Sequence, residues 1–363
     1  MVEGDPDAPV IVVRDTRDIV ITGLTFKGPS PGQIMMMNTH GSIIAENNFQ
    51  SPRTAILLEA STGNVIARNT IVRALDSGIE LRDGSDANQV SDNVINGTGA
   101  PETKGGGIFL HGTRHNRITH NLIENCIGFG IGVSNWDDAT INVSTSVVFN
   151  IVRNTAISAD DSGAIYILGR SGIDTRLVIA GNIVDGVGRS GRHTVGVYLD
   201  DSTSGALVTR NLIRRAGSDA IQIHGGSYNR IVNNVLDLGD GIASAVLFQA
   251  APADTNPLNL QRGNTVTGNL ILSSRHNPSL YVWYDGGSPL IAANFYVNRY
   301  GATTMPPAPA TDLQPVMGDP AVGVSYAAAQ TAADAAIGFT PLDLSNAGPR
   351  FNKRGGRTGL KSR

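Results

Sequence analysis

Residues 196–201 read Gly-Val-Tyr-Leu-Asp-Asp, and their alternation predicts a short β-strand. Its valine and leucine would point inward, and its tyrosine and first aspartate outward, because successive side chains of a strand face opposite sides. Two segments of the same shape flank it, GAIYI at 163–167 and AIQIH at 220–224. We therefore expect three successive coils of one stacked structure, whose outward residues form a row of polar and aromatic groups.

A repeated phrase, one asparagine followed by apolar residues, extends this pattern over most of the chain at intervals of 21 to 35 residues. Its asparagines are Asn48, Asn69, Asn93, Asn121, Asn150, Asn182, Asn211, Asn234, Asn269 and Asn294. Between them lies a second phrase, a small residue and then alternating apolar residues, such as GIEL at 78–81. Two short strand phrases per repeat predict an all-β fold, a right-handed single-stranded parallel β-helix of about ten coils.

The repeated asparagines are expected to be structural. Asparagine tolerates left-handed backbone angles at a corner, and its amide can hydrogen-bond to the equivalent asparagine one coil away. The longer inserts at 97–106, 134–146 and 249–263 are expected to be loops, which commonly carry the walls of a binding site.

The domain organisation follows from where the repeat stops. Residues 1–299 are expected to form the β-helix. Residues 300–350 are rich in Pro and Ala, and we expect an extended segment with a short helix at SYAAAQTAADAA that packs on or caps the solenoid. Residues 351–363 are basic and Gly-rich and are expected to be a disordered tail.

Composition excludes several classes of function. The net charge of −3 argues against a nucleic-acid partner bound through phosphate neutralisation. The single Cys126 excludes an intrachain disulfide, and no Cys/His spacing resembles a structural zinc site. No apolar run is long enough to span a membrane. The N-terminal residues show no signal peptide and enter a strand pattern almost at once, so we expect a truncated N-terminus.

Aligning the strand phrases coil by coil gives two columns of outward residues on one face. The first column is Leu57, Glu80, Phe109, Gly132, Tyr166, Tyr198, Gln222, Leu247 and Tyr281. The second is Glu59, Arg82, His111, Ser134, Leu168, Asp200, His224, Gln249 and Trp283. Because neighbouring coils lie ~4.8 Å apart, the tyrosines, Asp200, Gln222 and His224 in the middle of these columns are expected to lie close together.

A strip of aromatic, amide, imidazole and carboxylate groups is typical of a carbohydrate site, where carboxylates supply acid–base or nucleophilic catalysis. The pattern alone leaves a catalytic and a structural role equally open for Asp200, which lies on the strand face beside His224. The flanking aspartates, Asp160, Asp161 and Asp201, lie in turns, where aspartate also serves local hydrogen bonding. Other candidate substrate contacts, with turn, surface or loop-anchoring roles left open, are Asp160, Glu80, His111 and Trp136.

The run from residue 160 to 234 resembles the β-helix glycoside hydrolases of family 141, which include fucosidase- and xylanase-type enzymes. DDSGAIYILGR (160–170), VGVYLDDSTSG (195–205) and DAIQIHGGSYNRIVNN (219–234) carry the resemblance, with weaker support from AIGFTPLDLSNAG (336–348). It implies two acidic catalytic residues. One precedes the GAIY strand, at Asp161 or Asp160, and the other lies in the YLDD phrase, at Asp200 or Asp201.

The activity so implied is hydrolysis of a polysaccharide or oligosaccharide, with one carboxyl as acid and the other as base or nucleophile. His224 would position or tune Asp200. The expected contacts to sugar hydroxyls or a sugar carboxylate are Tyr166, Tyr198, Gln222 and Arg170. No metal or other cofactor is expected for this reaction, and the substrate class implies an extracellular or periplasmic location.

Two other classes of function stay open. A polysaccharide lyase or uronate epimerase needs a base and a cation that neutralises the uronate carboxylate; Lys104, Arg82, Arg114 and Arg170 are candidates for the cation. Calcium is the metal to expect in that case, with possible ligands Asp137, Asp138, Asp200 and Asp201. A non-catalytic solenoid, such as an adhesin or a phage tail part, is the other class, because a fold does not imply a function.

Overall fold

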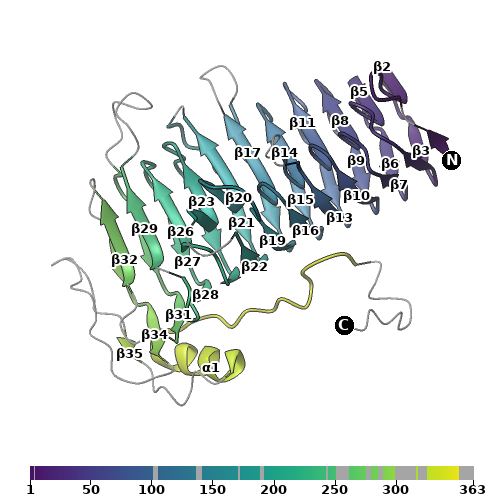
Figure 1. The fold of residues 1–363 in the computed structure, drawn as a ribbon. Helices are drawn as coiled ribbons and strands as arrows, with labels where there is room; N and C mark the ends of the chain where they lie inside the picture. The colour runs from purple at the N-terminus through teal and green to yellow at the C-terminus, as the bar shows by residue number, and fades with distance from the viewer. Residues whose placement is uncertain are drawn as a thin grey trace.

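The computed structural model shows a parallel β-helix (Figure 1). It describes residues 1–3, 5–100, 105–135, 141–170, 172–188, 192–242, 244–250, 261–274, 279–284, 289–298, 316–317 and 325–350. Within these residues every strand pairs in parallel with the equivalent strand of a neighbouring coil, which confirms the predicted all-β solenoid of about ten turns. None of the helices in this described part is long and apolar enough to cross a membrane.

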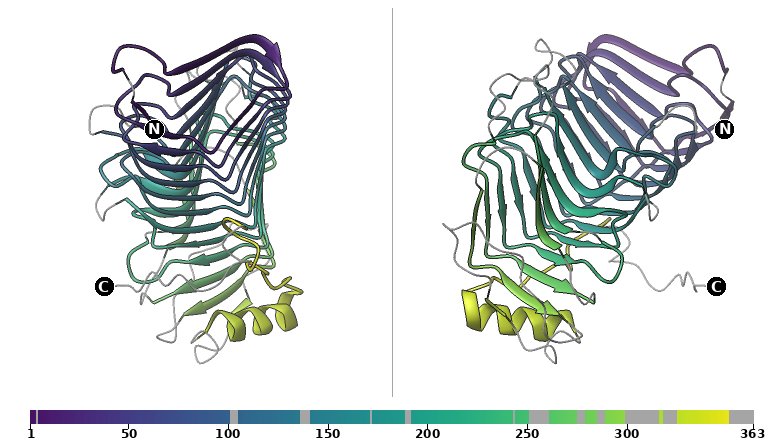
Figure 2. Two further views of the ribbon diagram at one scale, coloured as in Figure 1. Left: turned by 90° about the vertical axis from the view of Figure 1, so that its right-hand side faces the viewer. Right: turned by 60° about the vertical axis from the view of Figure 1, so that its left-hand side comes forward.

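Three sheets run along the solenoid, and each coil contributes one strand to each of them (Figure 2). The β2 sheet contains β2 (Ile11–Arg17), β5 (Ile34–His40), β8 (Ile56–Glu59), β11 (Ile79–Arg82), β14 (Ile108–His111), β17 (Ile131–Asn135), β20 (Ser162–Gly169), β23 (Thr194–Asp200), β26 (Asp219–His224), β29 (Ser244–Gln249) and β32 (Ser279–Tyr284). The β3 sheet contains β3 (Val20–Thr22), β6 (Ile43–Ala45), β9 (Val65–Ala67), β12 (Gln89–Ser91), β15 (Arg117–Thr119), β18 (Ser146–Val148), β21 (Val178–Ala180), β24 (Leu207–Thr209), β27 (Arg230–Val232), β30 (Thr265–Thr267) and β33 (Leu290–Ala292). The β1 sheet contains β1 (Val2–Glu3), β4 (Thr25–Lys27), β7 (Asn48–Gln50), β10 (Thr70–Ala74), β13 (Val94–Thr98), β16 (Leu122–Cys126), β19 (Ile151–Thr155), β22 (Ile183–Val187), β25 (Leu212–Arg214), β28 (Val235–Asp237), β31 (Leu270–Ser273), β34 (Phe295–Asn298) and β35 (Val316–Met317).

The hydrophobic core fills the inside of the coil, where the inward residues of all three sheets meet. In β23 the inward Val197 and Leu199 are fully buried, as are Ile221 and Ile223 in β26. The alternation read from the sequence is therefore the alternation of the folded strands.

The register of the β2 sheet confirms both predicted columns as far as β29 and corrects them at β32. Leu247 pairs with Val282, whereas Tyr281 pairs with Val246 and is buried with the core. Gln249 pairs with Tyr284 rather than with Trp283. A one-residue shift turns a whole strand over, and three of the four residues 281–284 are aromatic, so the sequence pattern fitted either register and did not reveal the shift.

The repeated asparagines form a continuous ladder at one corner of the coil. Each side-chain amide donates to the amide oxygen of the next asparagine at 2.9–3.1 Å, along Asn47, Asn69, Asn93, Asn121, Asn150, Asn182, Asn211, Asn234, Asn269 and Asn294. Two expectations are corrected here. The first ladder residue is Asn47, not Asn48. The left-handed angle at the corner belongs to the preceding residue, as in Glu46 (φ 58°) and Arg68 (φ 55°), because that residue makes the bend.

The predicted short helix is present as α1 (Tyr326–Ile337). Ser325 caps its N-terminus by accepting the Ala328 backbone N–H at 3.2 Å, and Gly338 ends it in the left-handed region. Ala329 and Ala333 are buried against β31 and β34 in a small apolar cluster outside the coil, so the helix packs on the outer face of the β1 sheet.

After α1 the chain turns back and runs along the side of the solenoid as residues 338–350, which we call the C-terminal strap (Figure 1). Asn233 exchanges two hydrogen bonds of 2.8 Å with the backbone of Thr340. Further along, Gly348 donates its N–H to the Phe149 carbonyl at 2.8 Å. Residues 299–315, 318–324 and 351–363 lie outside the described part, as do the centres of the three predicted loops.

Candidate functional site

Three adjacent strands of the β2 sheet, β20, β23 and β26, hold five of the predicted site residues: Tyr166, Tyr198, Asp200, Gln222 and His224. Tyr166 pairs with Tyr198, and Tyr198 pairs with Gln222. One position along, Leu168 pairs with Asp200, so the predicted adjacency is confirmed.

Asp200 is the centre of a first triad, Tyr166–Asp200–His224. The Tyr166 hydroxyl donates to Asp200 Oδ2 at 2.6 Å, and His224 Nδ1 donates to Oδ1 at 2.6 Å. Oδ1 also accepts the backbone N–H of Asp201 at 2.8 Å. Asp200 is buried, and both of its oxygens are engaged by the protein.

A second triad, Tyr198–Asp161–His193, lies beside the first. The Tyr198 hydroxyl donates to Asp161 Oδ1 at 3.1 Å, and His193 Nδ1 lies 3.4 Å from the same oxygen. His193 Nε2 donates to Gln222 Oε1 at 2.5 Å, since an amide oxygen can only accept. Both nitrogens of His193 therefore face acceptors, an arrangement that suits the imidazolium form.

The triads shift the pKa values of their histidines upward. The hydrogen bond to Asp161 raises the pKa of His193 and lowers that of Asp161. Burial lowers the pKa of His224, but the hydrogen bond and negative charge of Asp200 raise it by more. Burial and the nearby carboxylates raise the pKa of both Tyr166 and Tyr198, so the two phenols stay protonated and act as hydrogen-bond donors.

Asp201 lies on the other side of the first triad. Arg170 Nε donates to its Oδ2 at 3.0 Å, and His224 Nδ1 lies 3.8 Å from its Oδ1. Burial and the charge of Asp200 raise the pKa of Asp201 in spite of Arg170. The pKa values of Asp161 and Asp201 are thus moved in opposite directions by their surroundings.

Tight turns hold these carboxylates at the ends of the strands. Asp161 (φ 52°), Asp201 (φ 39°) and Ser202 (φ 69°) all have left-handed backbone angles, which cost energy in residues other than glycine. Asp160 Oδ1 accepts the backbone N–H of Asp161 at 3.2 Å and of His193 at 2.8 Å, so it braces the turn that presents Asp161.

A cleft of about 420 Å³ opens beside the second triad on the side of the earlier coils. Its lining includes Glu80, Asp160, Asp161 and Tyr166, all of them predicted site residues. The other lining residues among those described are Asp76, Ser77, Gly105, Phe109, Phe129, Ala159 and Ser162.

The remaining predicted substrate contacts lie elsewhere. His111 is one strand beyond Arg82 in the second column, 3.9 Å from Asp83 and outside the cleft lining. Gln222 and Tyr198 are buried, and each is hydrogen-bonded to a side chain of the second triad, Gln222 to His193 and Tyr198 to Asp161. Trp136 lies outside the described residues, as do Asp137, Asp138 and Lys104.

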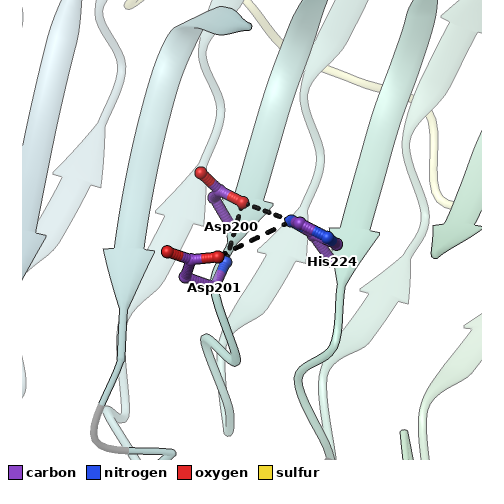
Figure 3. Close-up of side chains that lie close together, drawn as sticks. All are labelled: Asp200, Asp201 and His224. Carbon is purple, nitrogen blue, oxygen red and sulfur yellow. Dashed lines mark hydrogen bonds and ion pairs between the residues drawn. The ribbon is translucent and has the colours of Figure 1, made fainter. Parts of the chain in front are cut away.

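Within the part of the chain that the structure describes, Asp200, Asp201 and His224 are also the group of side chains that could hold a metal ion (Figure 3). One ligand atom from each lies within 4.8 Å of the others. Calcium prefers six to eight oxygen ligands, and His224 Nδ1 already donates to Asp200, so the set fits a hydrogen-bonded carboxylate–imidazole pair better than a calcium site.

Sequence reasoning missed two residues. His193 lies in the turn before β23, and the column alignment considered only strand positions. Phe129 precedes β17, and its ring lies over Gly132: a Cβ on that glycine would be 2.7 Å from Phe129 Cε2. The glycine between Phe109 and Tyr166 in the first column was the one available indication.

Comparison with known proteins supports the fold. Residues 7–148 match a family described as "Right handed beta helix region". The solenoid is right-handed, as predicted. No curated protein sequence gives a significant match.

Solved structures with a similar fold include three kinds of protein. The catalytic unit of a GH87 α-1,3-glucanase from Streptomyces thermodiastaticus strain HF3-3 is 13% identical, with a TM-score of 0.51 over 86% of this chain and 65% of that chain. A mannuronic acid specific family 6 polysaccharide lyase from human gut microbiota is 14% identical, with a TM-score of 0.45 over 83% and 78%. The Siphovirus 9NA tailspike receptor binding domain is 10% identical, with a TM-score of 0.46 over 79% and 51%. The chain spans about half the length of several structures it matches.

Proposed function

We propose that the protein is a glycoside hydrolase in which Asp201 is the general acid and Asp161 the base or nucleophile. The observation that carries this proposal is the opposite displacement of their pKa values. Two carboxyl groups whose surroundings move their pKa values apart are suited to acid and base roles in glycoside hydrolysis.

The roles follow from the contacts. Asp201, whose pKa is raised, is the better suited of the two carboxyls to carry the proton that is delivered to the glycosidic oxygen. Asp161, whose pKa is lowered, is ionised and either attacks the anomeric carbon or deprotonates a water. Asp200 is a positioning residue in this scheme, because its own oxygens are occupied by Tyr166, His224 and the backbone.

The resemblance to glycoside hydrolase family 141 supports the same pair of segments. It implies one acidic residue before the GAIY strand and one in the YLDD phrase, which agrees with Asp161 and Asp201. The α-1,3-glucanase that shares the fold is itself a glycoside hydrolase, although a likeness at 13% identity concerns the fold alone. The expected partner is a polysaccharide or oligosaccharide, and an extracellular or periplasmic location remains an expectation from this substrate class.

The test is turnover by Asp161→Asn, Asp201→Asn and the double variant Asp161→Asn/Asp201→Asn. The reducing ends released from plant, algal and bacterial polysaccharides would be measured. Each single variant should lose about 10²- to 10⁴-fold in kcat. Asp83→Asn is the matched control, since Asp83 is half exposed on the same face and outside the cleft lining. Unchanged turnover in the double variant would refute the proposal.

A lyase or uronate epimerase is the second candidate, favoured by the gathering of Arg170, His193 and His224 around the carboxylates. Against it, Tyr166 and Tyr198 hold their protons too firmly to act as phenolate bases for removal of the C5 proton. Absorbance of unsaturated uronates, followed together with reducing ends, separates elimination from hydrolysis. Loss of activity in EDTA would indicate bound Ca²⁺. If neither absorbance nor reducing ends increased, the result would favour a binding solenoid.

A further inference from the structure

Three aromatic residues of the first outward column, together with Phe129, form a continuous row of rings in the folded protein. Phe109 and Tyr166 are separated in register by Gly132, and the Phe129 ring fills the space above this glycine. The centroid of the Phe129 ring lies 5.4 Å from that of Phe109 and 6.4 Å from that of Tyr166. Tyr198 continues the row, 5.4 Å from Tyr166. We call these four residues the aromatic row.

The same cleft is acidic. Four carboxylates line it, Asp76, Glu80, Asp160 and Asp161, and no Lys, Arg or His is among the lining residues that the structure describes. The nearest ion pairs neutralise this charge only in part. Arg53 Nε lies 2.9 Å from Asp76 and His193 Nδ1 lies 3.4 Å from Asp161, but Arg82 is 3.8 Å from Glu80.

Ring faces and carboxylates favour the same ligand charge. The π-face of an aromatic ring attracts a cation, and a nearby carboxylate adds a direct Coulombic attraction. A uronate would meet repulsion from the carboxylates, and an uncharged sugar would gain only stacking. Phe109, Phe129 and Tyr166 line the cleft together with the acidic groups, so one ligand residue would meet both features.

We propose that this cleft is a subsite for a glycan residue that carries a protonated amino group. The inference rests on the proposed function in that the glycan enters the site beside Asp161. It goes further by naming the chemical class of the sugar. The amine would lie between the aromatic row and Glu80, with the neighbouring residue of the glycan extending toward the second triad.

Binding is measured directly, so that the result does not depend on turnover. The full chain carrying Asp201→Asn, a change outside the cleft lining, is titrated by calorimetry with a β-1,4-glucosamine hexasaccharide, its fully N-acetylated counterpart and an oligogalacturonate. At roughly pH 6 the amine-bearing oligosaccharide should bind at least about tenfold more tightly than the N-acetylated one. The advantage should shrink at roughly pH 8.5, where the sugar amine is neutral.

Two further substitutions locate the effect in the cleft. Glu80→Gln and Phe129→Ala, each added to Asp201→Asn, should reduce the preference for the amine by roughly threefold or more. Glu46→Gln is the control, because Glu46 is an exposed carboxylate paired with Arg68 outside this cleft. Glu80→Gln removes charge at nearly constant volume, so it keeps the test valid if Phe129→Ala fails to fold.

The outcomes separate the two proposals. Equal or tighter binding of the N-acetylated oligosaccharide, or a preference for galacturonate, would overturn the amine subsite. Hydrolysis of uncharged glycans without any preference for the amine would keep the proposed function and reject this inference. Selective binding of the amine without hydrolysis of any glycan would support the amine subsite and reject the proposed hydrolase function.

Discussion

Tyr166 and Tyr198 lie in neighbouring coils, and the hydroxyl of each donates a hydrogen bond to an aspartate of the other's coil. Tyr166 of β20 reaches Asp200 at the end of β23, and Tyr198 of β23 reaches back to Asp161 before β20. The two rings meet edge to face with their centroids 5.4 Å apart. A change in either ring is therefore expected to affect both carboxylates.

Tyr198→Phe tests this coupling. The hydrogen bond from Tyr198 is one of the contacts that lower the pKa of Asp161, so its loss should move that pKa upward. We expect the acidic limb of the kcat/KM profile to shift to higher pH by about half a unit, with a loss of up to about tenfold in kcat/KM. An acidic limb identical to that of wild type would count against Asp161 as the base. Tyr228→Phe, at an exposed tyrosine, is the control.

Gly132→Ala tests the aromatic row at the glycine over which the Phe129 ring lies. The new methyl group would lie 2.7 Å from Phe129 Cε2 and 2.9 Å from Cζ, so the ring must move away from the position it now fills. We expect glycan binding by calorimetry to weaken by about three- to tenfold, with a loss of less than about 2 kcal/mol in the free energy of unfolding. Gly32→Ala is the control because its methyl would meet nothing closer than 3.7 Å. Unchanged binding would mean that Phe129 has no part in the site.

At the scale of elements, the asparagine ladder joins one coil to the next inside a buried corner. From Asn69 onward, each asparagine oxygen accepts two bonds, one from a backbone N–H and one from a side-chain amide of the preceding coil, as Asn69 does from Asn47. Because buried amides must be satisfied, removing one member leaves donors unpaired on its neighbours. The ladder therefore stabilises the stacking of coils rather than any single strand.

Asn47→Ala and Asn48→Ala form a matched pair of adjacent residues. Asn47 is buried in the ladder, and Asn48 is half-buried at the start of β7. We expect Asn47→Ala to lower the free energy of unfolding by about 3 kcal/mol or more, and Asn48→Ala by less than about 1 kcal/mol, in urea denaturation. Equal losses would show that the ladder has no special role at this corner.

At the scale of the whole molecule, the C-terminal strap joins coils that do not otherwise touch. A solenoid is held mainly by contacts between neighbouring repeats, whereas the strap contacts Asn233 near one end and Asp92 much earlier. At its end, Arg350 makes three hydrogen bonds to the buried Asp92 carboxylate, two from its side chain and one from its backbone. We therefore expect the strap to raise the cooperativity of unfolding along the solenoid.

Arg350→Met tests this attachment. Burial raises the pKa of Asp92, but the hydrogen bonds from Arg350 lower it by more, so the net shift is downward. A lowered pKa contributes stability above the unfolded-state value of about 4, and this stability is lost as the pH falls through the folded-state value. Arg350→Met should therefore cost about 1 to 2 kcal/mol at roughly pH 6, discounted for the half-exposed arginine, and less at roughly pH 3.

The control for Arg350→Met is Arg68→Met, which removes an exposed ion pair and should cost less than about 0.5 kcal/mol. Urea unfolding at the two pH values measures the difference. A cost that stays constant with pH would contradict the role assigned to the Asp92 carboxylate.

The sequence by itself determined the solenoid, because a buried face with a period of two and a repeated asparagine leave few other folds that satisfy every backbone group. It also determined which outward residues share a face, since register between coils follows from the repeat. Tyr166, Tyr198, Asp200, Gln222 and His224 were brought together in this way. The same reasoning failed by one residue at Asn48 and at β32, where neighbouring residues fitted the pattern equally well.

Only the tertiary structure decided where the side chains of the turn residues lie. His193 and Phe129 lie before their strands, and no periodicity specifies the direction of a turn side chain; contacts with neighbouring coils place one beside Asp161 and the other over Gly132. The same holds for the pKa values of Asp161 and Asp201. These depend on burial and on partners from other coils, such as Tyr198 and Arg170, and short-range electrostatics of this kind exist only once the coils are stacked.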